Sequence, residues 1–368
     1  MPDLPRQVMK RLIQSVRLWL LACIPAMVAG CAAQGPRVQL AYFPPPPNPP
    51  HVVHLISFQS LSELIPPRLS LLDLLLGPPP GPHVMTPSGI AFLNHHLYLC
   101  DTERNVVHDW DLATGQARIV GAGTLSKPVA VAVDEESRLY VADTGTGQVL
   151  QFGSDGVLVR RFSSGNGDAK QTDSAYRPTA VAVCGDALYV TDVVSHRVDV
   201  FSTHDSARTA SIGGVGTGPG QFYYPMGLAI GPDQTLMIAD MLNARVQVLD
   251  AQHQPLRTMG QPGDRYGDLG KPRQLVVSPD GIIFIADSEF AHVHLFNMQG
   301  ELLMLLGGPD AAPGATPMPV GLAIARSLPE SIARLVPEGF SAGYFLFVTN
   351  TVADRPVSLF AVGHSTGR

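Results

Sequence analysis

The chain has 368 residues, of which 45% are hydrophobic and 15% charged, so it can bury a large core, and its composition excludes a largely disordered protein. Its 36 glycines and 33 prolines are too many for a helical protein and favour an all-β fold of short strands joined by many turns. The formal net charge of −6 makes nucleic acid an unexpected partner.

The first 30 residues have the pattern of a secretory signal. Basic residues precede an apolar run from Leu18 to Val28, which is too short to span a bilayer as a permanent helix. The run ends in VAGC, which resembles the bacterial lipobox. This resemblance implies that residues 1–30 are removed and that Cys31 is lipidated and becomes the first residue of the mature chain. The alternative is an ordinary secretory signal followed by an incidental cysteine.

The residue after the lipidation site bears on the compartment. By resemblance to sorting rules, Ala32 favours the outer membrane, with the body facing the periplasm or the surface. Removal of residues 1–30 leaves a net charge of about −9, which again argues against nucleic acid. We therefore expect membrane contact through the lipid anchor only.

The segment before the repeats divides into two parts. Residues 31–50 are interpreted as the lipid anchor and a proline-rich spacer, because FPPPPNPP from Phe43 is typical of polyproline. Residues 51–86 are interpreted as a closing strand and a leucine-rich connection. The alternation of HVVHLISF predicts a strand over His51 to Phe58. The cluster from Leu69 to Leu76 predicts a short helix packed on one end of the fold, or alternatively an exposed docking patch.

From Pro87 onwards, one pattern recurs along the chain. Six prolines, 41 to 50 residues apart, each open a strand of small apolar residues. In five units a second apolar strand ends in an acid, followed by a turn and a third strand, with a large apolar residue nine positions after the acid. The acids are Asp101, Asp143, Asp192, Asp240 and Asp287. Such a period indicates an array of four-stranded units and fits propeller blades better than a helical solenoid.

Two of these units, YPMGLAIGPDQTLMIADMLNARVQVLD and KPRQLVVSPDGIIFIADSEFAHVHLF, resemble NHL repeats. The resemblance implies an all-β, six-bladed β-propeller over residues 87–364. The sixth unit departs from the pattern, because Asn350 replaces the acid and an insertion at 326–343 separates its first two strands. In this insertion LPESIARLV predicts a short helix with Pro329 in its first turn, on a segment that projects from the face opposite the acids.

An open ring would expose the flanks of the first and last blades. The strand predicted over His51 to Phe58 is suited to be the outer strand of the sixth blade, beside VSLFAV at Val357. We therefore predict that the N-terminal strand closes the last blade.

The repeated acids are interpreted as structural. Each lies at the turn between the second and third strands rather than on the strand that lines the channel, and Asx side chains at turns bond the turn backbone. A ring of ligands is the alternative. Arg197 and Arg245, five residues after their acids, are expected to make polar links in or between blades.

The residues that follow the six inner-strand prolines are candidates for the channel mouth. They are Ser88, Val129, Thr179, Met226, Arg273 and Val320. In the NHL-type peptide-amidating lyase, histidines after the inner-strand proline in several blades hold zinc, and lactonase-like propellers gather carboxylates and Asn around calcium. Neither set occurs in this ring. Arg273 is its only charged member, so a small ligand there should be an anion.

Two other groups of side chains are candidates for metal binding or disulfide formation. His292 and His294 share one strand face but lack a third ligand, which is typical of a surface feature. Cys100 and Cys184 lie in separate predicted strands, and we expect each to be a small buried residue rather than half of a disulfide. We predict no catalytic residue, no metal site and no cofactor.

The sequence thus predicts a non-catalytic envelope lipoprotein whose propeller is a scaffold for another envelope protein. The proline-rich lead-in resembles that of bacterial envelope NHL proteins, some of which accompany multihaem cytochromes, so a cytochrome is one candidate partner. The alternative is a lactonase- or lyase-like propeller enzyme, or a carbohydrate-binding propeller. An apolar or acidic patch over several blades favours the scaffold, whereas a polar channel mouth with a divalent metal favours the enzyme.

Overall fold

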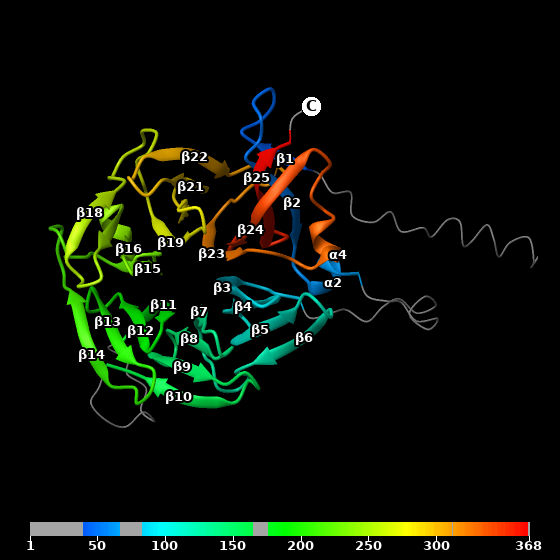
Figure 1. Ribbon diagram of the computed structural model, residues 1–368. Coiled ribbons are helices and arrows are strands. Elements are labelled where there is room, and N and C mark those ends of the chain that lie inside the picture. The colour runs from blue at the N-terminus through cyan, green and yellow to red at the C-terminus, as the bar shows by residue number, and fades with distance from the viewer. Residues whose placement is uncertain (1–39, 67–82, 165–175, 311, 367–368) are drawn as a thin grey trace, which may run out of the picture. The chain divides into compact units, whose positions relative to one another are not determined.

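Six β-sheets surround a central axis in the manner of propeller blades (Figure 1). The structure, a computed structural model, describes residues 40–66, 83–164, 176–310 and 312–366. It confirms the predicted all-β, six-bladed propeller. The predicted signal segment, Cys31 and the cluster from Leu69 to Leu76 lie outside the described residues.

Each of the first five blades is an antiparallel sheet of four consecutive strands, with the first strand innermost. Blade 1 contains β3 (Pro87–Leu93), β4 (His96–Asp101), β5 (Val106–Asp111) and β6 (Gln116–Val120). Blade 2 contains β7 (Pro128–Val133), β8 (Leu139–Asp143), β9 (Gln148–Phe152) and β10 (Leu158–Phe162). Blade 3 contains β11 (Pro178–Cys184), β12 (Ala187–Asp192), β13 (Arg197–Ser202) and β14 (Arg208–Gly213).

Blades 4 and 5 repeat this arrangement. Blade 4 contains β15 (Pro225–Ile230), β16 (Leu236–Asp240), β17 (Arg245–Leu249) and β18 (Pro255–Met259), with the short 3-10 helix η1 (Met241–Asn243) between β16 and β17. Blade 5 contains β19 (Pro272–Val277), β20 (Ile283–Asp287), β21 (His292–Phe296) and β22 (Leu302–Gly307). The inner strands of neighbouring blades contact one another around the whole ring.

The burial of the strands follows from their place in the blade. Second strands such as β8 and β20 are buried at every residue, because a neighbouring sheet covers each of their faces. Outer strands such as β14 and β18 contain exposed residues, because they border solvent. The apolar strands that recur in the sequence therefore form the apolar layers between neighbouring sheets.

The large residue nine positions after each acid fills the space between blades. All five of these side chains are at most 1% exposed: Trp110, Phe152, Phe201, Leu249 and Phe296. Phe152, for example, lies in one hydrophobic cluster with Tyr98 and Val107 of the preceding blade. Full burial of such a side chain stabilises the fold by about 1.5–3 kcal/mol.

The sixth blade joins the two ends of the chain. It contains β23 (Pro319–Ala325), β24 (Phe340–Asn350) and β25 (Val357–Ser365), followed by β2 (Val52–Phe58) and β1 (Ala41–Phe43). β2 pairs antiparallel with β25, so that Val53 lies opposite Ala361 and Phe58 opposite Val357. The predicted closure by the N-terminal strand is confirmed (Figure 1).

The structure differs from the predicted spacer in residues 43–50. β1 pairs antiparallel with β2, and the backbone N–H of His51 donates to the carbonyl of Phe43 at 2.8 Å. The proline run therefore forms the loop of a hairpin instead of an extended rod, and the spacer prediction is wrong for this stretch. The physical reason is that β2 offers a free edge, and prolines are tolerated in a loop because no ladder hydrogen bond needs their missing N–H.

The insertion in blade 6 is shorter than predicted, because β24 already begins at Phe340. The predicted short helix is present as α4 (Glu330–Ala333). Instead of projecting, the insertion packs on the core between blades 6 and 1, where Ile332 is fully buried in one cluster with Leu61 and Leu64 of α2 (Leu61–Leu64). Its apolar side chains pack against α2, a contact that the spacing of the repeats in the sequence does not indicate.

Two further findings concern single elements. Cys100 is buried, but Cys184 at the end of β11 is exposed, so the prediction of burial is wrong for Cys184; neither forms a disulfide. Within the described ranges, no helix has the length and apolar character needed to cross a membrane.

Candidate functional site

The repeated acids lie where turns meet the loops between blades. All five carboxylates are fully buried. Asp143 accepts hydrogen bonds from the N–H groups of Gly145 and Thr146 in its own turn, both at 2.9 Å. It also accepts from Ser126 at 2.6 Å and Lys127 at 3.0 Å, in the loop that precedes the inner strand. Each such acid therefore ties its turn to the loop that enters the same blade.

Asp287 repeats this arrangement in blade 5. It accepts from the N–H groups of Gly270 at 2.7 Å and Lys271 at 3.0 Å in the preceding loop, and from Glu289 at 3.0 Å in its own turn. Hydrogen bonds to a carboxylate offset the cost of burying its charge, which explains an ionised group in an otherwise apolar layer.

Asp101 shows the electrostatic consequence most clearly. Burial by itself would raise the pKa of this carboxyl. Hydrogen bonds from His108 and from the backbone N–H groups of Met85, Arg104 and Thr86 outweigh burial and lower the pKa of Asp101 to about 2. The carboxylate is therefore held in its charged form by the turn and the loop that it joins.

The acids of blades 3 and 4 use fewer backbone donors. Asp192 accepts from Arg177 and Val194, both at 3.1 Å. Asp240 accepts from the N–H of Tyr223 at 2.6 Å and from Nε of Arg245 at 2.9 Å. The other end of Arg245 donates to carbonyls of the loop between blades 3 and 4, whereas Arg197 pairs with Asp199 of its own strand at 2.9 Å.

Asn350 occupies the corresponding position in blade 6 and is also fully buried. Neither side-chain atom of Asn350 has a hydrogen-bond partner among the described residues. The sixth turn is held differently, since the N–H of Asn350 donates to the carbonyl of Pro356 at 2.8 Å. The amide thus replaces the acid in sequence but does not take over its bonds.

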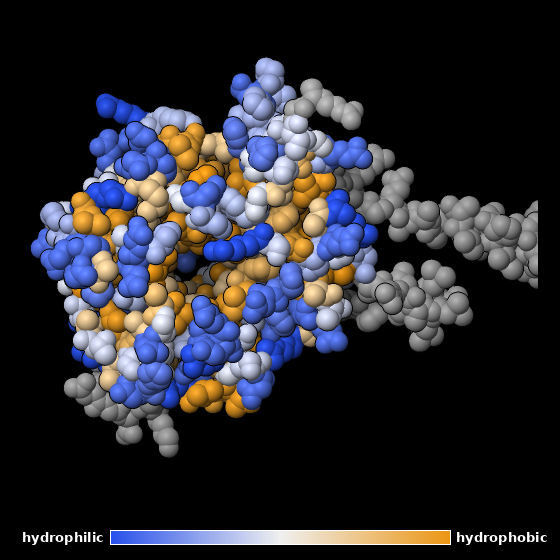
Figure 2. Space-filling view, in the orientation of Figure 1, coloured by the Kyte–Doolittle hydropathy of each residue, from blue (hydrophilic) through white to orange (hydrophobic). Residues whose placement is uncertain are grey.

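The six predicted channel-mouth residues lie near the start of the inner strands, one in each blade, and all are half-buried. The hydroxyl of Ser88 donates to the carbonyl of Val129 at 2.8 Å, and that of Thr179 to the carbonyl of Pro225 at 3.1 Å. These bonds link the inner strands of adjacent blades. Figure 2 shows the hollow at the centre of one face, with hydrophobic and hydrophilic residues around it.

Arg273 is the charged member of this ring. Its guanidinium lies 3.9 Å from the sulfur of Met241 in blade 4, and it forms no ion pair with any acid in the described part of the chain. Burial lowers the pKa of Arg273, and Tyr224 opposes this shift. An unpaired cation at this position would attract an anion rather than a metal.

The histidine pair of blade 5 differs from its interpretation as a surface feature. His294 is 3% exposed and stacks on Phe296, with ring centroids 6.2 Å apart. Burial lowers the pKa of His294 to about 4, although Asp287 opposes the shift and His292 adds to it. His294 is therefore a neutral core residue, and that part of the interpretation is wrong. In the described residues, no three or more His, Cys, Asp or Glu side chains are grouped so that they could hold a metal.

Six of the thirteen exposed large apolar side chains among the described residues are found on the side of the ring that carries the acids. Turns alternate between the two ends of an antiparallel blade, so the acid turns open on the same side as the loops that precede the inner strands. We call this side the acid-turn face. Its exposed large apolar residues among those described include Met85, Val194, Tyr223, Leu242, Met318 and Val352, each between 39% and 64% exposed.

Hydrogen bonds place these apolar residues directly on the acid turns. The N–H of Met85 donates to Asp101 and that of Tyr223 to Asp240. The N–H of Leu242 donates to the carbonyl of Tyr223 at 3.0 Å. The apolar residues therefore come from blades 1, 3, 4 and 6, and the corresponding loops of blades 2 and 5 present Lys127 and Lys271.

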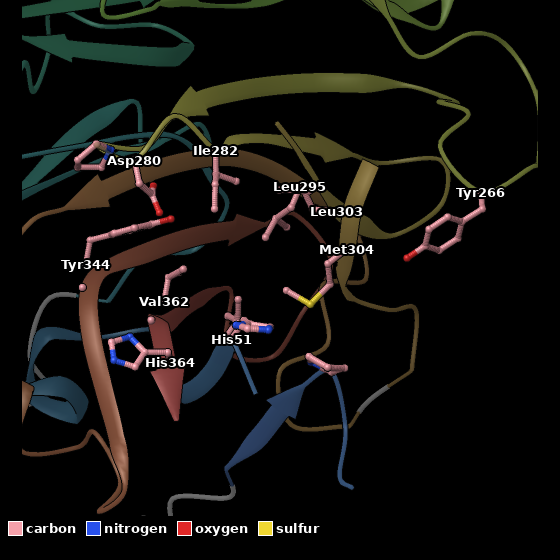
Figure 3. Close-up of a pocket in the computed structure, with 15 residues that line it drawn as sticks. His51, Tyr266, Asp280, Ile282, Leu295, Leu303, Met304, Tyr344, Val362 and His364 are labelled. Carbon is pink, nitrogen blue, oxygen red and sulfur yellow. The ribbon is translucent and has the colours of Figure 1, made fainter. Parts of the chain in front are cut away.

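A pocket that the sequence did not indicate lies between blades 5 and 6 (Figure 3). It has a volume of about 900 Å³. Its lining comes from three stretches, within residues 44–52, 266–304 and 343–364, so no local motif could have revealed it.

No protein-family model matches the chain, and no curated protein matches it. Solved structures do resemble it. The virginiamycin B lyase of Staphylococcus aureus is 11% identical with a TM-score of 0.52, over 76% of this chain and 85% of that chain. A gluconolactonase of Xanthomonas campestris is 15% identical with a TM-score of 0.53, over 84% and 89%. The calcium-binding protein regucalcin of Agrobacterium tumefaciens is 14% identical with a TM-score of 0.52, over 77% and 92%.

At these identities the likeness concerns the fold alone, because one propeller architecture supports many unrelated activities. The resemblance to NHL repeats stays a prediction. The chain is a six-bladed β-propeller that shares its fold with lyases, lactonases and calcium-binding proteins.

Proposed function

We propose that this chain is a non-catalytic scaffold of the bacterial cell envelope, held at the outer membrane by a lipid on Cys31, that binds another envelope protein through the acid-turn face. The observation that carries the proposal is the set of exposed apolar side chains on that face in blades 1, 3, 4 and 6. These blades form two adjacent pairs, 3 with 4 and 6 with 1. Exposed apolar patches mark protein interaction sites, and Tyr and Met are enriched at interfaces.

Two of the repeated carboxylates and two of the hydroxyls near this face already have structural partners. The carboxylates of Asp143 and Asp287 accept several backbone N–H groups each, and the hydroxyls of Ser88 and Thr179 bridge inner strands. These bonds support the rigid loops that present the apolar side chains. Rigid presentation reduces the entropy lost on binding a partner.

The partner we expect is an envelope protein with an apolar surface of its own, and a multihaem cytochrome is one candidate. The test places a photo-crosslinking residue at Leu242 on the acid-turn face, and at Leu256 on the outer strand β18 as a matched control. These side chains are 46% and 53% exposed. We expect one discrete crosslinked envelope protein from position 242 and none from position 256. Equal crosslinking at both positions, or none at 242, would contradict the proposal.

Serine variants of the same two surfaces provide a second test of the proposed interaction. The pair Tyr223→Ser and Leu242→Ser should abolish co-purification of the crosslinked protein, whereas Val159→Ser and Leu256→Ser should retain it. The control pair is at least as exposed, at 58% and 53%, so a general loss of solubility would affect both.

The alternative is an enzyme of the lactonase or lyase type. The full chain should hydrolyse no lactone and linearise no streptogramin, with or without added calcium or zinc. Turnover that EDTA abolishes would favour this alternative over the scaffold.

A further inference from the structure

The pocket between blades 5 and 6 is apolar over most of its surface. Leu295 of β21, Val52 of β2 and Val362 of β25 are at most 5% exposed and line it, together with Ile282 and Met304. Figure 3 shows Leu295, Met304 and Val362 surrounding the space. Such a lining favours the body of an apolar small molecule, since small-molecule sites are mostly apolar clefts with a few placed polar groups.

One end of the pocket carries two polar groups. Asp280 lies in the turn between β19 and β20, and Tyr344 lies on β24. Their side chains point toward one another (Figure 3), and the Tyr344 hydroxyl, in a residue only 5% exposed, lies beside the side chains of Asp280 and Ser278. Burial raises the pKa of Tyr344 well above its usual value. A side-chain hydrogen bond with Ser278 opposes this rise, whereas the charge of Asp280 and a hydrogen bond with its carboxylate add to it. The phenol is therefore neutral at neutral pH, and its oxygen keeps lone pairs that can accept a hydrogen bond from a ligand.

The carboxylate of Asp280 is exposed and can be reached by a ligand. It accepts a hydrogen bond from the Ser278 hydroxyl at 2.5 Å and forms no ion pair with any basic side chain that the structure describes. A carboxylate beside an apolar surface attracts a cation more strongly than one in bulk water. His51 and His364 lie at the opposite rim, where they could instead favour an anion.

We propose that this pocket binds a small molecule with an apolar body and one primary ammonium group, which donates to the Asp280 carboxylate and to the Tyr344 oxygen. The site is separate from the acid-turn face, because the turn that holds Asp280 joins the first and second strands and lies at the other end of the blade. The inference therefore does not depend on the proposed function.

The probes are 4-phenylbutylamine, 4-phenylbutan-1-ol and 4-phenylbutyrate, which share one apolar body and differ in the head group. Isothermal titration of the full chain at pH 8, where a primary amine is still protonated, measures their affinities. We expect one amine per chain, bound about tenfold more tightly than the alcohol, with the carboxylate weakest. Tighter binding of the carboxylate, or no binding of the amine, would overturn the proposal.

Blade 4 offers a matched control, because Pro232 and Asp233 occupy the same turn there as Pro279 and Asp280 in blade 5. Asp280→Asn should remove the tenfold advantage of the amine and leave the alcohol unchanged, whereas Asp233→Asn should change neither. Both carboxylates are exposed, so both variants should fold. Leu303→Trp, at a lining residue that is 50% exposed, should weaken the binding of all three probes. If the amine still binds more tightly than the alcohol in Asp280→Asn, the assigned ammonium site is wrong.

Discussion

At the scale of the residue, five buried aspartates do the same work in five blades. Each meets N–H groups from a turn, a preceding loop, or both, so one side chain replaces hydrogen bonds that the backbone cannot make with a neighbouring strand. Asn350 shows how specific this is, since its amide atoms have no partners in the described residues. An amide offers one acceptor oxygen and an NH₂ group that repels backbone N–H donors.

Asp143→Asn therefore tests the role of the acids. The change keeps the shape of the side chain but places an NH₂ group against donors that now bond a carboxylate. We expect the free energy of unfolding to fall by about 2–4 kcal/mol, measured by urea denaturation. The control is Asp155→Asn in an exposed turn of the same blade, which should cost less than about 1 kcal/mol. Similar losses for both variants would show that the hydrogen bonds of Asp143 contribute little to the free energy of unfolding.

His294 makes a prediction about pH. Burial holds its pKa at about 4 in the native chain against 6.5 in the unfolded chain, so between these values only the unfolded chain binds the proton. Stability should therefore fall as pH falls from 6.5 to 4, by roughly 3 kcal/mol in total from this residue. In His294→Leu, which copies Leu150 at the equivalent position of blade 2, this part of the pH dependence should disappear. An unchanged slope in denaturation experiments between pH 4 and 6.5 would contradict the burial of a neutral imidazole.

At the scale of the element, the strand β2 decides whether the ring is closed. Its side chains Val53, Leu55 and Phe58 are fully buried in the cluster between blades 6 and 1. β1 adds only three residues at the free edge, and these are partly exposed. The two strands of the hairpin should therefore differ greatly in what they contribute to stability.

Two truncations separate these contributions. A chain that begins after Phe58 should lose at least about 5 kcal/mol and aggregate, because it exposes an apolar flank and an unpaired strand edge. A chain that begins after Pro50 should melt within a few degrees of the full chain, since the only elements of the described propeller that it lacks are β1 and the proline loop. Thermal melting followed by circular dichroism makes the comparison. Equal melting of the two truncations would show that β25 does not need β2.

At the scale of the whole molecule, the lipid anchor proposed at Cys31 would determine where the acid-turn face can act. Cys31→Ser should prevent lipidation, because the thiol is the group that is acylated, and should leave an unprocessed or mislocalised chain. Mass spectrometry of the mature N-terminus and fractionation of the envelope test this. A mature chain that begins elsewhere, with an unmodified Cys31, would contradict the anchor while leaving the propeller unaffected.

The repeat itself was predictable from the sequence, because each blade must solve the same packing problem. A proline, a small apolar strand, an acid and a large apolar residue recur at fixed offsets, and these offsets specify which side chains lie between sheets. The same reasoning located β2, since its alternation needed a partner and blade 6 lacked an outer strand. The recurrence of this local pattern was enough to predict the propeller architecture.

Only the tertiary structure decided what distant segments do when they meet. The hairpin of β1, the docking of α4 and the burial of His294 each depend on a surface supplied by another part of the chain. The pocket between blades 5 and 6 has the same origin, because Asp280 and Tyr344 are 64 residues apart in sequence and converge only when two blades pack. Sequence patterns report contacts made within a repeat, whereas sites between repeats depend on burial and geometry that no single repeat encodes.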